Sequence, residues 1–177
     1  MEIPVTYHNE KGRKGKRIML AIVIVLLLVL WIPVSIDKLT DFEAFKSGIL
    51  RQPFSDRLGY FLIYTLPVLE ILVILALVNE RFRKAGFVLS TLLLTVFTGY
   101  IAVALLGAWE KLPCGCGSVI SGMTWLQHLY FNLFFLSLSI GGLYLWNKLR
   151  GSNAGGEATE GASAKRHIKK YSLTPKI

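Results

Sequence analysis

Four long apolar runs dominate the hydrophobic pattern of the chain. Each run has between 19 and 23 residues, and the four together contain only one Asp, Glu, Lys or Arg residue, Glu70, and one histidine, His128. A helix that crosses a bilayer needs about 20 predominantly apolar residues. Inside lipid a helix also satisfies its own backbone hydrogen bonds. The pattern therefore predicts an all-α, polytopic membrane protein, a bundle of four transmembrane helices at about 18–36, 58–78, 87–109 and 126–146.

The composition agrees with this class. Of the 177 residues, 53% are hydrophobic and 18% are charged, whereas about a quarter of the residues of a soluble domain are charged. The net charge of +9 would suit nucleic-acid binding, but basic cytoplasmic ends of a membrane protein produce the same balance. We find no nucleic-acid motif, so we expect membrane lipid and no nucleic acid as a partner.

The basic residues predict the orientation of the bundle. Fifteen of the 20 Lys and Arg residues fall before the first run, between the second and third, or after the fourth. The positive-inside rule then places both termini in the cytoplasm. No small-residue cleavage site follows the first run, so we expect it to be retained rather than removed as a signal peptide. The predicted parts are a basic cytoplasmic N-tail (1–17), a membrane domain (18–147) and a flexible basic cytoplasmic C-tail (148–177).

The first outer loop, residues 37–57, predicts a short amphipathic helix. Apolar residues recur there at helical spacing, and Thr40 with Glu43 matches a capping box. Such a helix would lie on the outer leaflet or over the mouth of the bundle. Packing and a substrate lid are both open interpretations.

The second outer loop contains both cysteines of the chain, Cys114 and Cys116, separated by Gly115. A bond between them would close a very small loop and add little stability. It would also be strained, and strained, exposed disulfides are the labile or catalytic ones. Lys111 nearby would favour the thiolate. The pair therefore indicates thiol–disulfide chemistry on the side where disulfides persist.

Two other interpretations of the pair stay open. In the first, the thiols are inert or structural and the protein is a non-enzymatic assembly or scaffold factor. Alternatively, Cys114, Cys116, Met123 and His128 together suit Cu(I) or zinc, although the spacing is not a standard zinc signature and we assign no metal ligand.

Polar residues inside the runs add further candidates. His128 could exchange protons during thiol chemistry. It belongs to one face of the fourth run that should point into the bundle, together with Trp125, Asn132, Phe135, Ser139, Gly142 and Trp146. Glu70 should be protonated, paired or facing a cavity. Counting depth along the helices predicts a polar layer around Glu70, formed with Thr95, Thr98, Ser137 and Ser139. Relaying protons, contacting a quinone head and only joining the helices through hydrogen bonds are all open roles for it.

Taken together, these residues resemble the methylamine-utilisation MauE family, within the DoxX-like redox-associated membrane proteins. The resemblance covers roughly residues 15 to 150 and is carried by Asp37-Lys38-Leu39-Thr40-Asp41-Phe42, Pro67-Val68-Leu69-Glu70, Pro113-Cys114-Gly115-Cys116-Gly117 and Trp125-x-x-His128-x-x-x-Asn132.

The resemblance implies a multi-pass protein of the bacterial inner membrane that supports extracytoplasmic thiol–disulfide exchange and maturation of partner proteins. A thioredoxin-like protein is then the expected partner, and the chain would be a component of a thiol–disulfide oxidoreductase system. The four-helix vitamin K epoxide reductase type is a more distant likeness. It generally has a Cys-x-x-Cys and a second cysteine pair, which this chain lacks.

Overall fold

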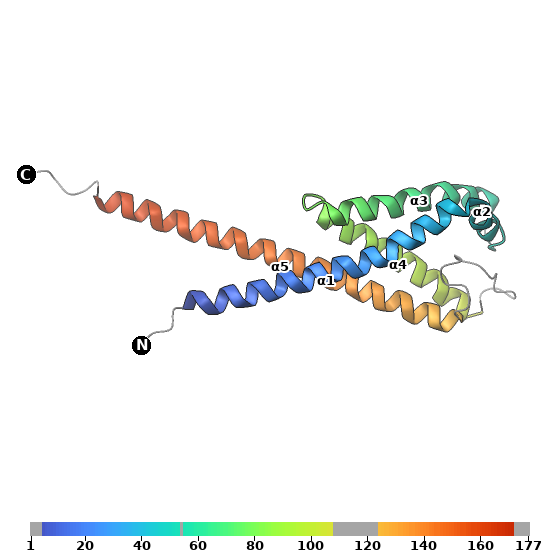
Figure 1. The fold of residues 1–177 in the computed structure, drawn as a ribbon, viewed down its shortest axis with the longest axis horizontal. Helices are drawn as coiled ribbons and strands as arrows, with labels where there is room; N and C mark the ends of the chain where they lie inside the picture. The colour runs from blue at the N-terminus through green and yellow to red at the C-terminus, as the bar shows by residue number, and fades with distance from the viewer. Residues whose placement is uncertain (1–4, 54, 108–123, 172–177) are drawn as a thin grey trace, which may run out of the picture.

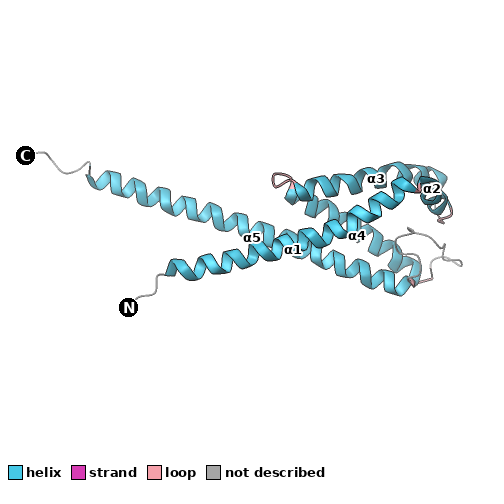
Figure 2. Cartoon of the chain, viewed as in Figure 1, coloured by secondary structure: helices cyan, strands magenta, loops and turns pink. Residues whose placement is uncertain are grey.

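The structure is a computed structural model that describes residues 5–53, 55–107 and 124–171. Within these residues the chain is entirely helical apart from short connections (Figure 2). The helices are α1 (Val5–Thr40), α2 (Phe42–Leu50), α3 (Asp56–Val78), α4 (Arg83–Leu105) and α5 (Trp125–Tyr171).

Four of these helices are long and apolar enough to cross a membrane, over Gly12–Thr40, Asp56–Val78, Arg83–Leu105 and Trp125–Gly151. This confirms the predicted class, a polytopic helical membrane protein. Many large apolar side chains along the four spans are exposed, among them Val25, Leu75, Val96 and Phe134. These outward-facing side chains are the surface that contacts lipid.

The four spanning helices form a ring in which α1 packs on α3, α3 on α4, α4 on α5, and α5 on α1. The first turn of α1 and the last turn of α5, which lead to the two chain termini, lie at one end of the molecule, and the short α3–α4 turn lies on that same side of the bundle (Figure 1). The helix α2, the last turn of α4 and the first turn of α5 lie at the opposite end. We refer to this second end as the α2 end.

The interior of the ring is apolar and closely packed. Its fully buried side chains include Leu27, Trp31, Ile63 and Phe87. Where α4 and α5 pack together, a Cβ added to Gly142 would lie 2.3 Å from Cε1 of Phe87. Small residues allow helices in membranes to approach in this way, and here the glycine makes room for a buried aromatic ring.

The helix ends differ from the sequence prediction in several places. The first span extends to Thr40 rather than residue 36, and α4 ends at Leu105 rather than residue 109. Gly107 adopts a φ of +79°, a left-handed conformation that glycine readily takes and that ends many helices. The charge-free run therefore continues past the last residue of the helix.

The C-terminal part of the chain also differs from the prediction. We expected a flexible tail from residue 148, but α5 continues without a break to Tyr171. The bundle itself does not continue with it, because α3 and α4 are much shorter and α5 runs beyond them (Figure 1). Residues 151–171 contain four alanines and four Lys or Arg residues, which favour helix, and four glycines, which oppose it.

Candidate functional site

The α2 end of the bundle carries an apolar cover. Its cover is the short helix α2, whose Ile49 is buried and whose Phe42 and Phe45 pack against the core. The ring of Phe42 also lies 6.2 Å from the ring of Tyr64 on α3. The apolar face predicted for the first outer loop is therefore turned toward the bundle.

The start of α2 is not the capping box that the sequence suggested. Thr40 is the last residue of α1, and its hydroxyl donates to the carbonyl oxygens of Ile36 and Asp37. Asp41 is the N-cap instead, and its Oδ1 accepts a hydrogen bond of 3.2 Å from the backbone N–H of Ala44. The prediction was wrong because α1 continues four residues further than its apolar run.

A second contact holds the connection after α2 against the bundle. Gln52 is buried, and its amide donates to the carbonyl oxygen of Gly48 at 3.0 Å. Its Oε1 accepts a hydrogen bond from the hydroxyl of Tyr100 on α4. Because the same side chain bonds both α2 and α4, it joins the cover to the far side of the ring.

The most polar feature inside the bundle is an ion pair between α1 and α3. The ammonium of Lys38 bonds Oε1 of Glu70, and the hydroxyl of Ser35 donates to Oε2 of Glu70 at 3.5 Å. Glu70 has an exposed fraction of 0% and Lys38 of 9%. The Lys38 ammonium also lies 5.6 Å from the ring centroid of Phe45, directly beneath the cover.

Of the three states expected for Glu70, protonated, paired or facing a cavity, the structure shows the paired one. Lys38 falls within the predicted first outer loop, residues 37–57. In the structure it belongs to α1, and because Ser35 and Lys38 are three residues apart they share one face of that helix. Burying both charges is favourable only with good geometry and additional hydrogen bonds. Ser35 supplies one such bond, so we regard the three residues as a single buried unit.

The polar layer proposed around Glu70 is not formed. Thr95, Thr98 and Ser137 each donate to a carbonyl oxygen of their own helix. Ser139 instead shares a hydrogen bond of 2.8 Å with Thr91 and donates to the carbonyl oxygen of Phe87. Depth counting failed because hydroxyls on a helix readily bond the preceding turn, and because depth alone does not say which helices are neighbours.

A further buried bond crosses the middle of the ring. Nε1 of Trp31 on α1 donates to the hydroxyl of Ser90 on α4 at 3.0 Å, and both residues are buried. In the sequence, Trp31 falls near the end of the first apolar run, where an interfacial position is common for tryptophan. The structure shows that it is a core residue linking two helices that lie across the ring from each other.

The predicted inward face of the fourth span is confirmed. Asn132, Phe135, Ser139 and Gly142 are buried, and His128 is half-buried. Nδ2 of Asn132 donates to the carbonyl oxygen of His128 at 3.0 Å. The two candidate residues thus lie together in the first two turns of α5, at the α2 end.

The first turn of α5 carries a capping box that the sequence analysis missed. The backbone N–H of Gln127 bonds the hydroxyl of Thr124 at 3.3 Å, and the N–H of Thr124 bonds Oε1 of Gln127 at 2.8 Å. The Thr-x-x-Gln sequence matches the capping-box pattern and could have predicted this helix start. The cap defines where α5 begins, and therefore where His128 is placed.

Three of the candidate residues, Cys114, Cys116 and Lys111, lie outside the described residues, as does Met123 of the metal alternative. The described chain leaves α4 at Gly107 and resumes at Thr124, and both points lie at the α2 end (Figure 1). Among the described residues, no group of three or more His, Cys, Asp or Glu side chains could hold a metal ion.

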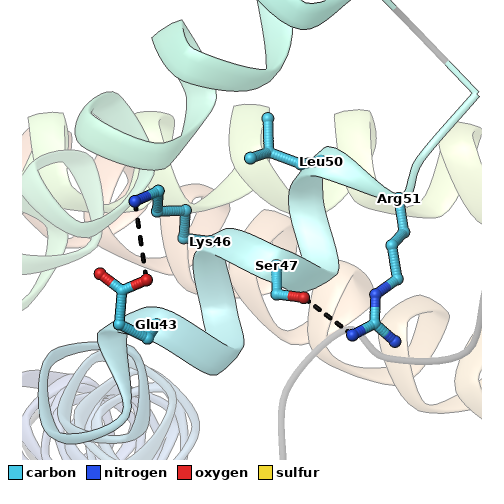
Figure 3. Close-up of a pocket in the computed structure, with 5 residues that line it drawn as sticks. All are labelled: Glu43, Lys46, Ser47, Leu50 and Arg51. Carbon is cyan, nitrogen blue, oxygen red and sulfur yellow. Dashed lines mark hydrogen bonds and ion pairs between the residues drawn. The ribbon is translucent and has the colours of Figure 1, made fainter.

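A shallow polar hollow of about 310 Å³ lies along α2. Figure 3 shows its lining, in which Lys46 faces Glu43 at 3.6 Å and Arg51 donates to the hydroxyl of Ser47 at 2.8 Å. Leu50 is the one apolar residue among the five. The hollow is open and polar, so it offers a surface for contact rather than an enclosed pocket.

Four apolar spanning helices, a cover helix at one end and buried polar contacts between the helices define a multi-pass helical membrane protein. Residues 16–145 match the family model described as methylamine utilisation protein MauE. The match covers well over half of the chain, and the protein belongs to the MauE family. No curated protein and no solved structure matches the chain.

Proposed function

We propose that this MauE-family protein takes part in thiol–disulfide exchange on the extracytoplasmic side of the bacterial inner membrane and supports the maturation of partner proteins, of the methylamine-utilisation type by family. The observation that carries the proposal is the Cys114-Gly115-Cys116 sequence. These cysteines are too close in the chain for their bond to stabilise the fold appreciably, so a chemical role is the better account of the pair.

The arrangement of the helices supports an outer location for the pair. The helix ends that flank residues 108–123 lie at the α2 end, opposite both termini and the α3–α4 turn. That turn and the start of α4 carry Arg81, Arg83 and Lys84, and the first tail carries five more basic residues. Basic loops are retained in the cytoplasm, so the cysteines belong on the other side.

The exchange would proceed through a mixed disulfide. The thiolate of one cysteine attacks a disulfide of a thioredoxin-like partner, the S–S bond breaks, and the released partner thiolate takes up a proton. The second cysteine then attacks the sulfur of the first. This step releases the other partner thiol and leaves a Cys114–Cys116 bond, so two electrons pass to the partner. The reverse sequence oxidises the partner.

Two features of the described residues fit this proposal. His128 and Asn132 lie at the start of α5, after the cysteine segment, where an imidazole can accept or donate a proton near neutral pH. The polar hollow along α2 offers Glu43, Lys46 and Arg51 for contact with a protein partner. Neither feature requires a resident cofactor.

Trapping of the mixed disulfide tests the proposal. With Cys116→Ser in cells, Cys114 cannot be released by its neighbour, so a partner protein should remain covalently attached until reductant is added. The matched control is Cys114→Ser, which reports whether either cysteine can attack first. Identification of the attached protein by mass spectrometry would name the partner.

Two results would contradict the proposal. If neither single variant forms a reductant-sensitive adduct and the thiols of the wild type do not react with maleimide in intact cells, thiol exchange is excluded. If the Cys114→Ser, Cys116→Ser double variant still supports partner maturation, the protein acts as a scaffold whose cysteines are incidental.

A further inference from the structure

A second cluster of polar and aromatic side chains lies at the end of the bundle that carries the termini. The guanidinium of Arg83 lies 5.3 Å from the ring centroid of Trp146, and that of Arg150 lies 5.8 Å from the same centroid. Arg83 begins α4 and the other two residues belong to α5. We call these three residues the Trp146 cluster.

Both guanidinium groups lie against one indole ring, and little negative charge compensates them. Among the described residues of this end, only Glu80 approaches Arg83, at 3.4 Å, and its side chain is 83% exposed. Such an exposed pair contributes little. Arg150 has no acidic partner within the described part of the chain. Arg81, Lys84 and Lys148 add three more exposed cations nearby.

One arginine of the cluster is fixed in place. Nε of Arg83 donates to the carbonyl oxygen of Leu77 at 3.2 Å, near the last turn of α3, and its side chain is only 15% exposed. Arg150 is exposed and its described interaction is with the indole ring. The cluster thus pairs a fixed guanidinium with one that is free to receive an anion.

The position of the cluster favours a lipid as the source of that anion. The span that begins at Arg83 and the span that ends at Gly151 meet the membrane boundary here, and tryptophan prefers this boundary. Exposed apolar and aromatic side chains, Val88 on α4 and Tyr144 on α5, lie one turn further into the spans. Acyl chains attached to a headgroup at the cluster would meet an apolar surface.

We propose that the Trp146 cluster binds the phosphate-bearing headgroup of an anionic phospholipid in the leaflet that faces the two termini. Guanidinium groups bind phosphate through charge-assisted hydrogen bonds, often in pairs. Basic sites between transmembrane helices on the cytoplasmic side are suited to such headgroups. The inference does not depend on the cysteines or on the proposed thiol chemistry.

Native mass spectrometry of the purified full-length protein tests the proposal. The protein in non-ionic detergent is titrated with phosphatidylglycerol and, separately, with phosphatidylcholine of the same acyl chains. Arg150→Gln is the informative variant because Arg150 contributes no described hydrogen bond to the fold. We expect it to weaken phosphatidylglycerol binding about fivefold, corresponding to about 1 kcal/mol per basic residue, and to leave phosphatidylcholine binding unchanged.

Arg13→Gln is the matched control, because it removes the same charge from an exposed position of α1. It should weaken binding less than twofold. Equal effects of the two variants would overturn the proposal, since they would show attraction to net charge alone. Inorganic phosphate is the third compound titrated into the protein. If it binds as tightly as phosphatidylglycerol and displaces it at equal concentration, the site is for a soluble anion and the assignment to lipid is wrong.

Discussion

Lys38 and Glu70 show most clearly how the side chains in this bundle depend on one another. Each is an ionisable group in a largely apolar interior, and each is the main partner of the other. In a buried pair the loss of one partner costs more than the loss of both, because the remaining charge is then desolvated without compensation.

We therefore expect Lys38→Met to destabilise the bundle by about 3–5 kcal/mol and the Lys38→Met, Glu70→Leu double variant to recover most of that loss. The measurement is denaturation in mixed detergent micelles followed by circular dichroism. Strictly additive effects of the two single changes would show that the side chains are not coupled. Ser35→Ala should fall between the wild type and Lys38→Met.

Glycines at neighbouring positions of α5 should behave in opposite ways. At Gly142 a Cβ would lie 2.3 Å from the buried ring of Phe87, whereas at Gly141 nothing lies within 4 Å. Gly142→Ala should cost about 1–3 kcal/mol through overpacking. Gly141→Ala should be neutral or slightly stabilising. The same unfolding assay decides, and a Gly142→Ala variant as stable as Gly141→Ala would contradict the close approach.

At the scale of single elements, α2 is, among the described helices, the one too short to cross the membrane, and it covers an end of the bundle. Its stability depends on a cap at its start, on Ile49 against the core and on the Gln52–Tyr100 bond after its last residue. An isolated helix of nine residues is marginal in water, so these contacts hold it in place.

The residue that caps α2 can be tested directly, because the structure assigns the N-cap to Asp41 whereas the sequence pattern assigned it to Thr40. Asp41→Ala should destabilise α2 locally by about 1 kcal/mol, since the Ala44 N–H loses its acceptor. Thr40→Ala should have little effect, because the Thr40 hydroxyl bonds carbonyl oxygens of α1. Hydrogen exchange of the α2 amides measures both. Faster exchange in Thr40→Ala than in Asp41→Ala would restore the capping box inferred from sequence.

At the scale of the whole molecule, the ring of four helices separates two chemically different ends. One end bears the termini, the α3–α4 turn and the Trp146 cluster, and the other bears α2 and the helix ends that flank the cysteine segment. The charge distribution and this topology together make a specific prediction about sidedness.

In a variant whose two native cysteines are replaced by serine, Ser55→Cys and Asn79→Cys place single thiols at exposed positions of the two ends. A membrane-impermeant maleimide added to cells with a permeable outer membrane should label Ser55→Cys almost completely. Asn79→Cys should react only after the inner membrane is disrupted. The opposite pattern would place the cysteine segment in the cytoplasm and exclude the proposed thiol exchange.

Much of this architecture could be predicted from the sequence, because hydrophobic length and helical periodicity are local properties. The four spans and the inward face of α5 follow from the cost of placing backbone and polar groups in lipid. Asn132 and Ser139 were assigned to that face and are buried there.

Only the tertiary structure decided which helices are neighbours and how far each is shifted along its neighbour. That decision made Lys38 the partner of Glu70, made Trp31 a core residue bonded to Ser90, and turned Ser139 toward Thr91. Periodicity fixes the face of one helix, but a pair contact also depends on the rotation and offset of a second helix, and no local pattern specifies either. The helix sequence of α1 alone could not show that its last turns would be buried against α3.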